Sequence, residues 1–100
     1  MASNKEYLDF ILEQLSLLEE IKVRKMMGEY IIYYKNKIIG GIYDNRFLVK
    51  QTPLSKNLIP NASLEKPYDG GKEMILVDNI ENKEFLKTLF VSMYDELPKK

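Results

Sequence analysis

Two polar turns divide the apolar middle of this chain into short segments. Lys35-Asn36-Lys37 and Asp44-Asn45 separate runs of β-branched and aromatic residues that begin at Tyr30. Such residues favour strands, and asparagine readily adopts the left-handed backbone of a tight turn. The pattern predicts a meander of three strands. Gly40-Gly41, inside the second strand, predicts a bulge or a close approach by another backbone.

Amphipathic helices are predicted at both ends of the chain. Ser3 with Glu6 fits a capping box that begins the first helix. Apolar residues recur at three- and four-residue spacing and form one face of this helix. They are Tyr7, Leu8, Ile11, Leu12, Leu15 and Leu18. Asn82 is the expected N-cap of the last helix, and Pro98 ends it. The apolar stripe of that helix consists of Phe85, Leu86, Leu89, Phe90, Met93 and Leu97.

Further strands are predicted on either side of the meander. Residues 21–24 alternate between apolar and basic side chains, as in a half-buried strand that Gly28 ends or bulges. Met74-Ile75-Leu76-Val77 is a last, largely buried strand. These segments predict a two-layer α+β domain over residues 1–100, with a mainly antiparallel sheet of about five strands and both terminal helices on one face.

The segment 51–72 is too long for a structureless loop in a compact domain. Thr52 as N-cap and Pro53 at the first helical position predict a short helix, which ends at Ile59 because Pro60 disfavours helical geometry there. Gly70-Gly71-Lys72 lacks the upstream glycine of a phosphate-binding loop and precedes a strand, so it is interpreted as a turn.

Composition excludes several classes of function. Fifteen basic and fifteen acidic residues give a formal net charge of zero, so no global field attracts nucleic acid. The chain has no histidine or cysteine, which removes the usual ligands of zinc and the bases and nucleophiles of serine or thiol catalysis. We therefore expect no metal, no cofactor and no enzymatic activity. The absence of a signal peptide pattern or membrane span predicts a cytoplasmic protein.

One motif resembles a known family. Arg24-Lys25-Met26-Met27-Gly28-Glu29-Tyr30, continuing through Ile31 to Gly40, is similar to the signature of the TfoX N-terminal domain, which opens the bacterial competence regulators of the TfoX/Sxy type. Asp44 to Thr52 extends the resemblance. It implies a fold like that of type III secretion chaperones, frequent dimerisation, and a role in transcriptional co-regulation. The regulators continue into a C-terminal helical domain, to which nothing here corresponds.

The same motif supplies the candidate partner-binding surface. Arginine and methionine suit adaptable protein interfaces, and we expect the surface to hold another protein or a second copy of this chain. Alternation along a strand places Arg24 and Met26 on one face and Lys25 and Met27 on the other. In a purely structural interpretation, one methionine fills the core and Gly28 serves backbone geometry. The candidate residues are Arg24, Lys25, Met27, Gly28, Glu29 and Tyr30.

Nucleic-acid binding is the alternative function. Aromatic strands flanked by cations can stack bases and neutralise phosphates, and the cations here are Lys35, Lys37, Arg46 and Lys50. Tyr33 and Tyr34 are neighbours, however, and must point to opposite faces of a strand. They cannot both belong to one platform, and cross-strand packing explains most of the tyrosines. A small-molecule enzyme is the third alternative, supported by no positive feature.

Overall fold

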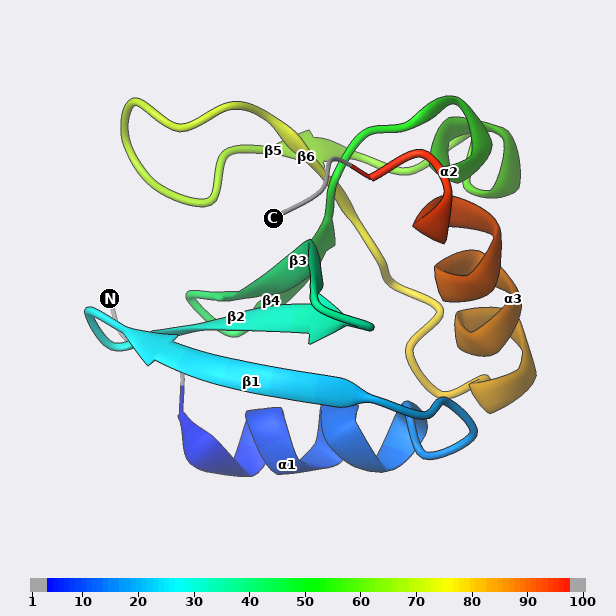
Figure 1. The fold of residues 1–100 in the computed structure, drawn as a ribbon. Coiled ribbons are helices and arrows are strands. Elements are labelled where there is room, and N and C mark those ends of the chain that lie inside the picture. Colours follow the sequence, from blue (N-terminus) through cyan, green and yellow to red (C-terminus); the bar gives the residue numbers. More distant parts are fainter. Residues whose placement is uncertain (1–3, 98–100) are drawn as a thin grey trace.

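The domain contains a six-stranded sheet. Its helices lie along one face of the sheet (Figure 1). The computed structural model describes residues 4–97. Its helices are α1 (Lys5–Gln14), α2 (Pro53–Leu58) and α3 (Lys83–Tyr94). Its strands are β1 (Ile21–Met26), β2 (Glu29–Tyr34), β3 (Lys37–Tyr43), β4 (Arg46–Val49), β5 (Leu64–Glu65) and β6 (Met74–Leu76).

The sheet has the order β1-β2-β3-β4-β6-β5, and all its neighbouring strands are antiparallel. Two-residue turns join the first four strands at Met27-Gly28, Lys35-Asn36 and Asp44-Asn45. All six turn residues have positive φ, which matches the twist of a hairpin. The predicted meander and its turns at Asn36 and Asn45 are confirmed.

The glycine pair of β3 meets both of its predicted requirements. Tyr33 pairs with Ile38 while Ile32 pairs with Gly40, so Ile39 is the extra residue of a bulge. A Cβ on Gly40 would collide with the backbone oxygen of Leu48 on β4. A Cβ on Gly41 would lie 2.5 Å from the backbone oxygen of Tyr30. The neighbouring strands therefore approach β3 more closely than any side chain allows.

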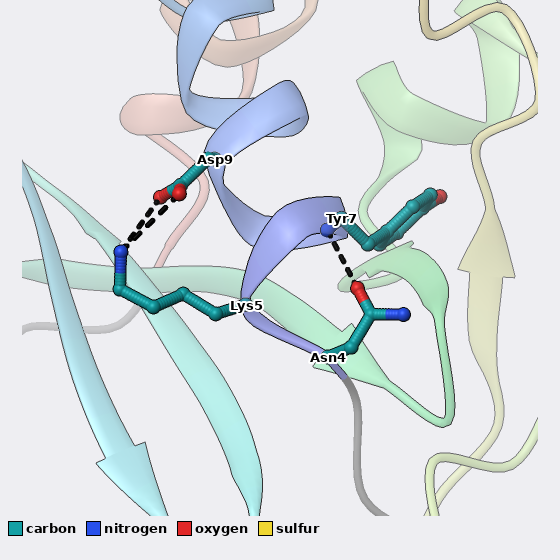
Figure 2. Close-up of polar contacts among 4 residues, drawn as sticks. All are labelled: Asn4, Lys5, Tyr7 and Asp9. Atoms are coloured by element: carbon teal, nitrogen blue, oxygen red, sulfur yellow. Dashed lines mark hydrogen bonds and ion pairs between the residues drawn. The ribbon is translucent and has the colours of Figure 1, made fainter.

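The N-cap of α1 is Asn4. Its Oδ1 accepts a hydrogen bond of 2.7 Å from the backbone N–H of Tyr7, and Lys5 pairs with Asp9 one turn on (Figure 2). The backbone N–H of Asn4 donates to Oδ1 of Asn45, which ties the helix to the β3–β4 turn. Ser3, the predicted partner in a capping box, lies outside the described residues, as does Pro98.

The core lies between the sheet and the two long helices. Tyr34 and Phe47 pack their rings against Phe90 of α3, with ring centroids 6.0 and 6.1 Å apart. One cluster joins both helices to alternate residues of the sheet, which confirms the predicted two-layer α+β fold with both helices on one face. Its buried members from α1 and its end are Leu8, Ile11 and Leu15, and those from α3 are Leu86, Leu89, Phe90 and Met93.

The chain between β4 and α3 differs from the prediction in one element. Thr52 and Ser55 form a capping box at the start of α2, and Ile59 is its C-cap, as predicted. The extra strand β5 has only two residues and therefore no periodicity to detect; its pairing with β6 makes it a strand. Among the described residues, no helix is long and apolar enough to cross a membrane.

Candidate functional site

The face of the sheet opposite α1 and α3, here called the open face, is apolar at its centre. Antiparallel sheets with one uncovered face usually present polar side chains there. Here Ile31 and Leu48 are buried on the open face, although neither belongs to the core cluster beneath the helices. Ile38 and Tyr43 of β3 lie beside them and are half-buried. Apolar side chains, two of them buried, therefore form the centre of the open face.

A groove crosses the open face between the β1–β2 turn and the β5–β6 loop. Both segments project toward the left of the view in Figure 1. Two adjoining hollows of about 810 and 820 Å³ form the groove and share four lining residues, Ile38, Tyr43, Lys50 and Tyr68. The first hollow is also lined by Met26, Met27, Glu29 and Ile31, and the second by Gln51, Pro67, Gly70, Gly71, Lys72, Glu73 and Met74.

The β5–β6 loop holds its aromatic side chain over the groove. The backbone N–H of Gly71 donates to the carbonyl of Tyr68 at 3.0 Å, and Gly70 takes the positive φ of 86° that this turn requires. The Tyr68 ring packs edge-on against Tyr43, with centroids 6.3 Å apart, yet the side chain remains 63% exposed. The predicted turn is thus confirmed at Gly70 and Gly71, although it begins at Tyr68 and does not include Lys72, and it shapes one wall of the groove.

The opposite wall carries two exposed methionines. Met26 is 48% exposed, and Met27 is 96% exposed with a φ of 54°. Neither fills the core, so the structural interpretation of the pair is wrong. The prediction that Met26 and Met27 face opposite ways is also wrong, because β1 ends at Met26 and the turn directs both toward the groove. Methionine adapts its shape to varied apolar partners.

The polar groups of the groove differ in their bonding. Glu29 Oε1 accepts a hydrogen bond of 3.1 Å from the backbone N–H of Asp44. Burial raises the pKa of the Tyr43 hydroxyl, and Tyr68, Glu29 and Tyr33 raise it further. Lys50 is half-buried, and its ammonium forms no hydrogen bond or ion pair with the described residues. Lys50 is therefore a half-buried cation of the groove that lacks a counterion within residues 4–97.

The structure divides the candidate partner-binding residues between two faces. Met27 and Glu29 line the groove, and Gly28 allows the turn with a φ of 83°. Arg24 lies on the open face opposite Ile31. Lys25 pairs with Tyr30, whose side chain is buried in the core under the helices. Because side chains alternate between the faces of a strand, Lys25 and Tyr30 lie on the face of the sheet opposite the groove and do not share a surface with Met27.

The four cations proposed for nucleic acid do not form one patch. Lys37 donates to the Tyr94 carbonyl at 3.0 Å, and both Lys35 and Lys37 lie over the Tyr94 ring. Arg46 pairs with Glu65 at 2.6 Å, so its charge is neutralised. Lys50 alone lines the groove. Of the meander tyrosines, Tyr30 and Tyr34 are buried in the core, whereas Tyr33 and Tyr43 are half-buried.

Residues of the groove that the motif does not contain come from distant parts of the chain. Tyr68 and Pro67 belong to the β5–β6 loop, which appears in the sequence only as a proline- and glycine-rich segment. Ile38 and Tyr43 appear as ordinary strand residues. A sequence signal existed for the methionine pair alone, because two adjacent methionines precede a turn glycine.

Comparison with known proteins shows one relative. The chain is 31% identical over 80 residues to the "Uncharacterized 12.7 kDa protein in trpE 5'region" of Spirochaeta aurantia, covering 80% of this chain and 70% of that protein. The two proteins belong to one family. No family model matches the chain, so the resemblance to the TfoX N-terminal domain stays a prediction. No solved structure matches it either.

Proposed function

We propose that the domain is a non-enzymatic interaction module that binds an apolar segment of a partner protein in the groove. Met27 carries the proposal. Its side chain is almost fully exposed, and it occupies a left-handed position that glycine, asparagine and aspartate adopt more readily than other residues. The other two turns of the meander have lysine, asparagine or aspartate at such positions. Met27 is thus unfavourable in two ways, as an exposed apolar side chain and as a non-glycine residue with a left-handed backbone. Because neither feature stabilises the fold, they point to function.

The shape and chemistry of the groove support binding rather than catalysis. Its hollows have the volume of a site for a drug-sized ligand or a short peptide. A general base works best with a pKa near the operating pH. Burial raises the pKa of the Tyr43 hydroxyl further from neutrality, so a smaller fraction is ionised and able to accept a proton at neutral pH than in an ordinary tyrosine.

The cellular context of the proposal comes from the sequence. The resemblance to TfoX N-terminal domains supports a role in transcriptional co-regulation, and the absence of cysteine is consistent with a cytoplasmic protein. A second copy of this chain is the other partner that the resemblance supports.

Photo-crosslinking from the groove tests the proposal. The chain is expressed in its cell of origin with p-benzoylphenylalanine at position 27, and at position 91 as a control. Val91 is also an exposed apolar residue, at 51%, but lies on α3. We expect an adduct from position 27 that position 91 does not form and that Ile38→Asp abolishes.

Two results separate the alternatives. An adduct at twice the mass of the chain identifies a second copy as the occupant. Identical adducts from both positions, or none from position 27, contradict the proposal. Circular dichroism of each variant establishes that the fold is retained.

A further inference from the structure

The chemistry of the groove limits the kinds of ligand that can bind there. Apolar side chains from four strands and a loop line it, which suits a segment with large apolar residues. Lys50 stands in this apolar setting with no acceptor for its ammonium among the described residues. A half-buried cation surrounded by apolar groups is stabilised by a carboxylate that enters with the ligand, because the low local dielectric strengthens the pair.

Other charges near the groove are differently placed. Glu29 already accepts a backbone hydrogen bond from the β3–β4 turn. Lys72 and Glu73 are exposed on the rim, where ion pairs contribute little. Lys50 is therefore the charge with most to gain from a partner.

The carboxylate that binds Lys50 could belong to the C-terminus of a partner chain or to an aspartate or glutamate side chain. The position of Lys50 distinguishes between these two sources. Lys50 belongs to the lining shared by the two hollows, so the groove continues beyond it in both directions. If the C-terminal carboxylate of a bound peptide paired with Lys50, the peptide would end there and leave one hollow empty. A side-chain carboxylate leaves the backbone free to continue into both.

We propose that the occupant is an extended peptide segment with an internal aspartate or glutamate flanked on both sides by large apolar residues. The carboxylate binds the Lys50 ammonium, and the apolar side chains fill the two hollows. This inference rests on the proposed function, and Lys50 acts as its specificity-determining residue.

Selection from a phage library of random twelve-residue peptides tests the inference on the full chain. Parallel selections use the unmodified protein, Lys50→Glu and Ile38→Asp. We expect the unmodified protein to enrich peptides with a central acidic residue between apolar ones. Lys50→Glu is expected to enrich lysine or arginine at that position, and Ile38→Asp to lose these peptides.

Affinities of the best peptide complete the test. We expect Lys50→Gln to weaken binding about tenfold by fluorescence anisotropy, and replacement of the peptide carboxylate by its amide to do the same, with no further loss when both are combined. Lys87→Gln, on the exposed surface of α3 and outside the groove, is the matched control and is expected to change affinity less than about twofold.

The outcomes separate the two proposals. Peptides that require Ile38 but show no acidic preference and bind Lys50→Gln normally overturn the inference and leave the proposed function in place. If no peptide depends on the groove, the proposed function fails as well. Met27→Asn, which changes an exposed turn residue, provides a second groove variant if Ile38→Asp does not fold.

Discussion

Replacing Met27 by asparagine is expected to stabilise the protein while weakening its binding. Met27 has a φ of 54° and precedes Gly28 in a two-residue turn. The left-handed backbone costs most residues roughly 1–2 kcal/mol, and asparagine tolerates it far better. Asn-Gly is also the preferred pair in such a turn.

The size of the effect follows from the exposure of the side chain. Because Met27 is 96% exposed, its removal sacrifices almost no buried apolar area. The lower cost of the left-handed backbone is then the main contribution, and it raises the free energy of unfolding of the variant by about 0.5–1 kcal/mol. For a domain of this size, that corresponds to an increase in Tm of about 3–6 °C.

Calorimetry and urea unfolding measure the stability, and crosslinking or peptide affinity measures the binding. Met27→Leu is the control, because leucine keeps the apolar surface and the backbone cost; we expect its Tm and its binding to remain near those of the unmodified protein. A Met27→Asn variant that is less stable than the unmodified protein, or that binds as well, would refute the reasoning.

Three further predictions concern the scaffold. Gly40→Ala is expected to lower the free energy of unfolding by roughly 3 kcal/mol in urea titrations, because the new methyl collides with the backbone of Leu48. Thr52→Ala is expected to cost about 1 kcal/mol in the same assay, through loss of the cap that accepts the Ser55 N–H at 3.0 Å. The raised pKa of Tyr43 means that the unfolded chain loses this proton first, so stability falls as pH rises above about 10. Tyr43→Phe should reduce that decrease, measured as the change in urea midpoint between neutral and alkaline pH.

Local signals predicted most of the fold. Asn36 and Asn45 marked the turns because few residues accept a left-handed backbone, and Thr52 with Pro53 marked α2 through hydrogen bonding at its first turn. The strand β5 escaped prediction because two residues carry no periodic pattern. Its existence depends on the hydrogen bonds that β6 offers.

The candidate site was only partly predictable. The motif around Met27 contains one wall of the groove. The sequence predicted that Met26 and Met27 point to opposite faces, as neighbours in a strand do, but β1 ends at Met26 and Met27 belongs to the turn. Tyr30 is a candidate binding residue in the sequence because it closes the motif. The register with Ile42 instead places it beneath the helices.

By itself, the sequence determined the helices, the turns of the meander and the apolar faces of the two long helices, because turn chemistry, capping and hydrophobic period all act over a few residues. Only the tertiary structure decided that Tyr68, Lys50 and Met27 border one groove. They lie on a loop, a strand end and a turn that are far apart in the chain, and no local interaction links them. The order of strands in the sheet brings them together, and that order depends on which edges pair when the core closes.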